Sequence, residues 1–244
     1  MLSRSWINAS VLDGDLPFAV VPGADGSPPV YVVDDVLPAE KNRMLDQMFE
    51  DDNLWTEEFG FFDSATGYDP QSAKRSKEKW LAAPERERLF FYRSLRSDID
   101  AAHFAPGWAT WLLFRRAMAD ADFLNRLRRG AGVSLRKATV SAHAIIQERG
   151  HFQKRHKDRG QNRVLCGALY VGPGWQPGFG GEFEFVVGDR IDRMIAPVSN
   201  RLVLFDPHAK SADGKRSLHR MLPLTDAAGN WQRRSITLWW CDEG

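Results

Sequence analysis

The pattern of hydrophobic and polar positions changes near Gly132. Before this glycine, apolar residues recur at helical spacing, and the segments that open at Pro38 and Pro84, together with residues 108–129, predict three helices. Residues 30–33 predict a short strand before the first of them. The first half of the chain is therefore predicted to be mostly helical.

Residues 51–83 interrupt this helical pattern. They combine glycines, a proline, a stretch rich in Lys, Arg and Ser, and several aromatic side chains. Such a composition predicts a long loop, and a loop beside a rigid scaffold commonly carries specificity. We expect this loop to act as a lid.

After Gly132 the chain alternates apolar and polar residues in short segments that turn residues separate. The predicted strands are residues 138–147, 163–171, 182–187, 190–195, 201–205, 219–224 and 233–240. Many short strands at this spacing predict a sandwich or barrel. We predict one domain over residues 1–244, in which residues 1–132 supply helices, a strand and the lid, and residues 133–244 form a β core.

Composition and charge narrow the function classes. The 33 Lys and Arg residues and 32 Asp and Glu residues give a net charge of +1, which disfavours a nucleic-acid partner. The two cysteines, Cys166 and Cys241, are too few for a disulfide framework or a four-cysteine zinc site. Neither a signal peptide nor a membrane-spanning apolar run is visible, so we expect a soluble, cytoplasmic protein without a membrane partner. The oligomeric state is left open.

The candidate chemistry begins with His156-Lys157-Asp158. On an extended segment the side chains of His156 and Asp158 point to the same face, so both can bind one metal ion. His219, at the start of a later predicted strand, is the expected third ligand, and His208 is its rival. Two imidazoles and one carboxylate are the ligand set of non-haem Fe(II) oxygenases, whereas zinc usually prefers a tetrahedral site. The alternatives are an ion pair at a strand edge and an ordinary core histidine.

A second candidate site lies on the last predicted strand. Alternation places Arg233, Ser235 and Thr237 on one face, and Ile236 and Leu238 on the other. A buried arginine with hydroxyl neighbours suits a carboxylate ligand, because the guanidinium fork matches a carboxylate in geometry and charge.

Taken in order, these residues resemble the Fe(II)/2-oxoglutarate-dependent dioxygenases, and among them the prolyl-4-hydroxylase-like branch. The resemblance covers residues 139–240, with a weaker match at residues 31–38. Its motifs are Gly150, His156-x-Asp158, a strand carrying Tyr170, Gly180-Gly181-Glu182-Phe183, residues 201–206, His219 and Arg233-x-Ser235-Ile236-Thr237-x-Trp239.

The resemblance implies a fold, a site and a set of cofactors. The fold is a double-stranded β-helix, a jelly-roll core with N-terminal helices packed on one sheet, and its class is mainly β with supporting helices. The implied catalytic metal ligands, here for Fe(II), are His156, Asp158 and His219. The implied binding residues for 2-oxoglutarate are Arg233, which would pair with its distal carboxylate, Tyr170, Ser235 and Thr237. O2 is the other cosubstrate, and ascorbate is a candidate reductant.

The predicted reaction is hydroxylation of an unactivated C–H bond with release of succinate and CO2. The carboxylate of Asp158 favours hydroxylation over halogenation, because related halogenases carry a small residue at this place. One departure is Gln147, where many members have a tyrosine. We expect a small-molecule substrate, such as an amino acid or a natural-product intermediate, with a protein side chain as the alternative. A metal-binding barrel without turnover and a cupin-like enzyme without the cosubstrate also remain open.

The substrate expectation includes a charge. Residues 149–163 are rich in Lys and Arg. Such a run is typically a solvated face. The alternative is that one or two of these cations, with aromatic side chains from residues 55–80, receive an anionic substrate.

Overall fold

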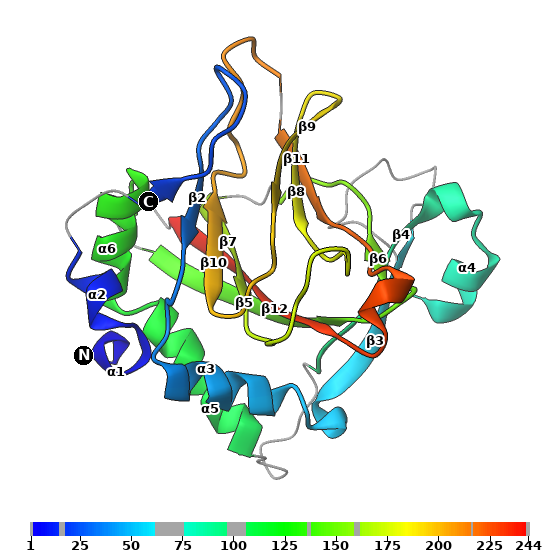
Figure 1. Cartoon of the computed structure of the whole chain (residues 1–244), viewed down its shortest axis with the longest axis horizontal. Coiled ribbons are helices and arrows are strands. Elements are labelled where there is room, and N and C mark those ends of the chain that lie inside the picture. Colours follow the sequence, from blue (N-terminus) through cyan, green and yellow to red (C-terminus); the bar gives the residue numbers. More distant parts are fainter. Residues whose placement is uncertain are drawn as a thin grey trace.

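The computed structural model of the chain describes residues 2–14, 18–61, 76–96, 106–135, 138–158, 162–215 and 217–242. Within these residues the chain forms a large antiparallel sheet, a small antiparallel sheet and a layer of helices (Figure 1). None of the helices in these ranges is long and apolar enough to cross a lipid bilayer.

The strands of the β core are divided between two sheets. The strands of the large sheet are β1 (Ala19–Val20), β2 (Val30–Val33), β3 (Trp55–Phe61), β4 (Arg88–Leu95), β5 (Ala138–Gln147), β6 (Phe152–Gln153), β7 (Arg163–Tyr170), β10 (Arg201–Phe205) and β12 (Arg233–Asp242). Their order is β1-β2-β10-β7-β12-β5-β4-β3, and β6 pairs with β4. The small sheet has the order β11-β8-β9, with β8 (Phe183–Val187), β9 (Arg190–Ile195) and β11 (Ser217–Met221).

Helices cover one face of the large sheet, and the small sheet lies over the other (Figure 1). The covering helices are α1 (Ser3–Trp6), α2 (Ala9–Leu12), α3 (Ala39–Met48), α5 (Pro106–Met118) and α6 (Ala121–Ala131). The remaining helix, α4 (Lys77–Ala82), contacts β3 at the far end of the molecule. This arrangement confirms the predicted double-stranded β-helix with helices packed on one sheet.

Alternation along β12 separates an apolar core from the barrel interior. Ile236, Leu238 and Trp240 pack into the helix-facing core, and all three are fully buried. Arg233 and Ser235 are also buried, but they occupy the alternate positions and therefore face the other side of the sheet. The predicted division of this strand into two faces is confirmed.

Three predictions for the first half are wrong. Residues from Pro84 onward do not form a helix: Glu85–Glu87 is a single 3-10 turn, and Arg88–Leu95 is strand β4. The aromatic residues in this strand suit a half-buried pleated surface, and pairing with β3 and β5 overrides the helical spacing. The predicted loop over residues 51–83 contains β3 and α4, while residues 62–75 lie outside the described ranges.

The predicted helix over residues 108–129 is two helices. The side chain of Asp120 accepts a hydrogen bond from the Asp122 backbone N–H and so begins α6 after a break. The left-handed backbone of Gly132, with φ of 67°, follows the end of α6. An Asp at the N-cap and a Gly after the C-terminus commonly mark helix boundaries. The Asp marks the break between α5 and α6, which the sequence prediction missed.

Candidate active site

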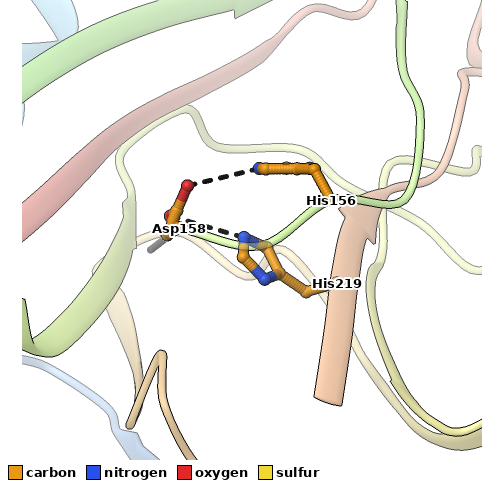
Figure 2. Close-up of side chains that lie close together, drawn as sticks. All are labelled: His156, Asp158 and His219. Carbon is orange, nitrogen blue, oxygen red and sulfur yellow. Dashed lines mark ion pairs between the residues drawn. The ribbon is translucent and has the colours of Figure 1, made fainter. Parts of the chain in front are cut away.

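Three buried side chains meet between the two sheets. His156 and Asp158 come from the extended segment after β6, and His219 comes from β11. Asp158 Oδ1 lies 3.4 Å from His156 Nε2, and Asp158 Oδ2 lies 3.4 Å from His219 Nε2 (Figure 2). One potential ligand atom from each residue lies within 4.8 Å of the other two. The spacing is that of a group able to bind one metal ion.

Backbone pairing holds the two histidines side by side. The N–H of His156 donates to the His219 carbonyl at 2.9 Å, and the N–H of His219 donates to the His156 carbonyl at 3.1 Å. His156 Nδ1 lies 2.9 Å from the Lys154 carbonyl, so a proton belongs on Nδ1, and Nε2 is the ring atom that faces Asp158. The ring of His219 packs against Phe205, with 4.6 Å between centroids. Contacts of this kind fix the orientation of metal ligands.

The three groups shift each other's pKa values. Burial alone would raise the pKa of Asp158, but the charge of His219 and hydrogen bonds from both histidines hold it well below its ordinary value. Burial lowers the pKa of His156, but the hydrogen bond and charge of Asp158 and the hydrogen bond to the Lys154 carbonyl together raise it. Burial and the charge of His156 lower the pKa of His219. The site therefore holds an ionised carboxylate beside histidines of unequal basicity.

A second buried carboxylate ties the ligand-bearing segments together. Glu184 on β8 is only 1% exposed. Its Oε1 accepts hydrogen bonds at 2.8 Å from the Nε of Arg155 and from the Nε of Arg220, and Arg220 Nη2 also reaches Oε2 at 3.1 Å. Burial would raise the pKa of Glu184, but the hydrogen bonds and charges of both arginines lower it. Because Arg155 and Arg220 are the neighbours of His156 and His219, Glu184 fixes both segments.

Sequence reasoning did not identify Glu184. The only available signal was its place on a predicted strand whose alternate residues, Phe183 and Phe185, are apolar. A charged residue between apolar neighbours normally indicates an exposed position, and its partners are distant in sequence.

The start of β12 has a different character, because its buried polar groups lack partners. Arg233 is 1% exposed, and its Nη1 donates to the Gly181 carbonyl at 3.4 Å. Its Nε has no hydrogen-bond partner among the described residues. Gln147 is its cross-strand neighbour on β5, and both side-chain amide atoms of this buried residue also lack partners there. Burial lowers the pKa of Arg233 to about 10.

The other predicted binding residues lie along the same interior. Tyr170 is buried and donates its hydroxyl to Met221 Sδ at 3.3 Å. Burial raises its pKa, so the phenol stays protonated. Ser235 is the cross-strand neighbour of Tyr170, and Thr237 lines the cavity that contains the three metal-ligand candidates. The structure thus brings all seven predicted residues to the barrel interior.

The rival residues do not join the site. His208 is exposed. Cys166 and Cys241 are free cysteines, and burial raises the pKa of Cys166 well above its ordinary value. In the cationic run, Arg149 pairs with Asp226 at 3.5 Å, and Lys154 donates to the backbone carbonyls of residues 85 and 86. Lys157 and Arg163 line the cavity.

The donor sets fit a metal ion and a carboxylate ligand. Two imidazoles and a carboxylate on one side of a metal leave positions for a chelating ligand, as in non-haem Fe(II) oxygenases. A buried guanidinium and a buried amide with unpaired N–H groups are costly unless a ligand accepts from them. A carboxylate supplies such acceptors.

Comparison with known protein families agrees with this combination of a metal ion and a carboxylate ligand. Residues 140–241, which contain His156, Asp158, His219 and Arg233, match the family model of the 2OG-Fe(II) oxygenase superfamily. This domain belongs to that superfamily. The protein is accordingly a dioxygenase that uses Fe(II), 2-oxoglutarate and O2. No curated protein matches the chain in sequence.

Solved structures show that this oxygenase has a prolyl-hydroxylase-like fold. A prolyl-4-hydroxylase from Pseudomonas putida is 20% identical with a TM-score of 0.54, over 89% of this chain and 94% of that one. A prolyl hydroxylase from Trichoplax adhaerens, solved with a peptide fragment of hypoxia inducible factor, is 16% identical with a TM-score of 0.57, over 88% and 84%. A 2OG-Fe(II) oxygenase family oxidoreductase from Burkholderia pseudomallei is 12% identical with a TM-score of 0.52, over 93% and 95%.

Proposed function

We propose that this oxygenase hydroxylates an unactivated C–H bond of a small molecule and releases succinate and CO2. In this proposal His156, Asp158 and His219 bind Fe(II), and Arg233 binds the distal carboxylate of 2-oxoglutarate. The observation that carries it is the buried Arg233, whose Nε has no partner among the described residues and which shares the barrel interior with the His-Asp-His group.

The residues have separate tasks. Bound Fe(II) and 2-oxoglutarate supply the oxidation of a C–H bond by O2. His156 and His219 would bind the metal ion through the Nε2 atoms that face Asp158, and Asp158 presents an ionised carboxylate because its pKa is low. Arg233 provides charge and direction for the distal carboxylate, and Gln147 Nε2 adds a neutral donor beside it. Tyr170 and Ser235 line the same interior and keep water from this end of the barrel.

The small size of the cavity supports a small-molecule substrate. Its volume is about 150 Å³, and its walls come from both sheets. Dedicated sites for drug-sized ligands are usually about 300–1,000 Å³. The second candidate is hydroxylation of a protein side chain, favoured by the fold shared with prolyl hydroxylases. A single side chain also fits such a cavity.

The test is anaerobic addition of Fe(II) and 2-oxoglutarate, followed by the weak visible charge-transfer band of the complex. We expect the band in the wild type, its loss in His156→Ala, and a requirement for much more 2-oxoglutarate in Arg233→Ala. The absence of a band in folded, metal-loaded wild type would contradict the assigned ligands. An unchanged 2-oxoglutarate requirement in Arg233→Ala would contradict the carboxylate role and favour a cupin-like enzyme.

Turnover distinguishes the remaining alternatives. A small-molecule hydroxylase forms succinate in proportion to substrate lost, and a protein hydroxylase does so only with a polypeptide. Binding of Fe(II) and 2-oxoglutarate without oxygen consumption across both kinds of substrate would instead indicate a barrel that binds without reaction.

A further inference from the structure

The cavity beside the metal-ligand candidates has a wall whose residues have no role in the proposed reaction. This wall is built from β4, β5, β12 and the beginning of β7. Its side chains are Phe90, Tyr92, His143, Ile145, Arg163 and Trp239. The wall is therefore aromatic and apolar, with one guanidinium among its members.

Arg163 is held in a fixed position at this wall. Its Nη1 donates to the Asp158 backbone carbonyl at 3.0 Å, and its guanidinium carbon lies 4.6 Å from the ring centroid of Trp239. An arginine has five N–H donors, so most of its hydrogen-bonding capacity remains. Within the described ranges no carboxylate side chain forms an ion pair with Arg163. The guanidinium is thus oriented by a backbone carbonyl and a ring, neither of which neutralises its charge.

The balance of charge around the cavity favours an anion. Among the described residues that line it, Asp158 is the only carboxylate, and the two histidines already share that carboxylate. Lys157 and Arg163 are cations on the same lining. When Fe(II) and 2-oxoglutarate are bound, the negative charges of Asp158 and the cosubstrate are matched by the metal ion and Arg233. The charge of Arg163, which forms no ion pair within the described ranges, is then left without a carboxylate partner.

A nearby acidic side chain does not alter this balance at the wall. Glu58 lies behind His143, with 3.7 Å between its Oε1 and His143 Nε2, and it accepts a hydrogen bond of 2.6 Å from Ser94. Glu58 is not part of the cavity lining. It supports His143 and is not placed to pair with Arg163.

The rest of the wall suits an apolar body. Phe90 and Tyr92 stack with their centroids 4.9 Å apart, and Ile145 packs in the same buried cluster. Trp239 completes the surface on β12. Aromatic faces and an aliphatic side chain gain free energy by covering apolar surface.

We propose that the substrate is a small apolar molecule with a free carboxylate, and that Arg163 binds this carboxylate while Phe90, Tyr92 and Trp239 contact its body. This inference rests on the proposed function, because it names the substrate class of the same site. A carboxylate on Arg163 places the apolar part of the molecule in the cavity that contains His156, Asp158 and His219. A cavity of about 150 Å³ accommodates a body the size of one ring. We therefore expect a compact, free acid.

The same carboxylate chemistry occurs in a glutamate side chain of a polypeptide, so the test separates these sources. Protein loaded with Fe(II) and 2-oxoglutarate is titrated by calorimetry under argon. The probes are 3-phenylpropanoate, 4-methylpentanoate, their uncharged amides, and a short capped peptide with one glutamate. The variants are Arg163→Gln and Arg163→Lys. The matched control is Arg149→Gln, which removes a cation of the same run that pairs with Asp226 away from the cavity.

We expect the acids to bind wild type about tenfold to a hundredfold more tightly than their amides, as charge-assisted hydrogen bonds predict. Arg163→Gln reduces this preference to less than about threefold, Arg163→Lys retains part of it, and Arg149→Gln retains all of it. Binding of 2-oxoglutarate stays unchanged in all three variants. If Arg163→Gln does not fold, loss of the fork geometry in Arg163→Lys gives the same test in weaker form.

Equal binding of acids and amides would overturn the inference, as would an acid preference that survives in Arg163→Gln. So would a preference shown by the peptide alone, or the failure of every acid to bind protein that is normally loaded. These outcomes leave the proposed function standing. Failure of the wild type to form the charge-transfer band in the first place is the separate result that removes the proposed function.

Discussion

The two groups of buried polar side chains in the barrel differ in how their partners are supplied. His156, Asp158 and His219 pair with one another. Arg233 and Gln147 have polar atoms without any partner in the described structure. The first group is organised by the protein alone, whereas the second is satisfied only when a ligand accepts from it.

The metal-binding group is thus preorganised, whereas the Arg233 group contributes to the affinity for the cosubstrate. The metal-binding group costs less to keep in the folded chain, because its polar atoms already have partners in the protein. The Arg233 group holds a desolvated cation that destabilises the free protein, and a bound carboxylate removes that penalty. Part of the binding free energy of the cosubstrate thus comes from relief of an unfavourable feature of the fold.

The largest effect is expected for His219→Ala. Loss of one imidazole leaves too few ligands, so Fe(II) binding and the charge-transfer band should disappear, and turnover should fall by at least about a thousandfold. Metal content and anaerobic absorbance measure this. The matched control, His208→Ala, changes an exposed histidine and should leave both readouts intact. Retention of the band in His219→Ala would show that the metal end is built from other residues.

Arg233→Met should act in opposite directions on the affinity for 2-oxoglutarate and on the stability of the protein. We expect the affinity for 2-oxoglutarate to fall about a hundredfold. The free energy of unfolding of the metal-free protein should rise by about 1–3 kcal/mol, because a buried unpaired cation is replaced by an apolar side chain. Denaturant unfolding and titration of the charge-transfer band check both. Arg234→Met removes an ion pair with Asp46 and should destabilise instead. A destabilised Arg233→Met would show that the buried guanidinium does not destabilise the free protein.

Glu184→Gln tests whether the metal end is held by protein groups. Removing a carboxylate that serves two arginines should destabilise the metal-free protein by about 2 kcal/mol. The pKa of Glu184 is lower in the folded state than its ordinary value of 4.5, so its contribution is present above that value and is lost as pH falls through the folded pKa. Chemical unfolding from pH 7 to pH 3 should show wild type and variant converging. A constant difference over that interval would assign the effect to packing instead of charge.

The smallest effect is expected at Gln147. Gln147→Leu removes one neutral donor, so the affinity for 2-oxoglutarate should fall about threefold to tenfold with metal binding unchanged. A control is Gln232→Leu, in which the lost amide serves Glu148 outside the barrel interior. Unaltered 2-oxoglutarate affinity in Gln147→Leu would leave Arg233 as the sole polar anchor at this end.

The sequence predicted most of the β core and its site because both depend on local alternation and spacing. The strand over residues 138–147 and the two faces of β12 follow from period two, and His156 and Asp158 share a side for the same reason. Strand β4 was missed because Leu89, Phe90 and Tyr92 also fit a helix, and only pairing with distant strands decides.

The remaining errors and omissions come from long-range contacts. Glu184 gains its meaning from Arg155 and Arg220, which no local pattern connects to it. The cavity wall at Phe90 and Tyr92 depends on the placement of β4. The aromatic partners of the cations were therefore expected from residues 55–80, whereas the described lining draws on β4 and β12. The single-domain organisation, the cytoplasmic location and the roles of individual site residues stay predictions.

The link between Arg155, Glu184 and Arg220 has a practical consequence for handling the protein. Because these residues and the backbone pairing of His156 with His219 hold the site through protein contacts, we expect the ligand geometry to persist when a chelator removes the metal ion. Reconstitution is then a simple diffusion of metal into a ready pocket, without refolding. Repeated cycles of chelation and reloading should return the same occupancy, which makes metal exchange in this oxygenase a reversible titration.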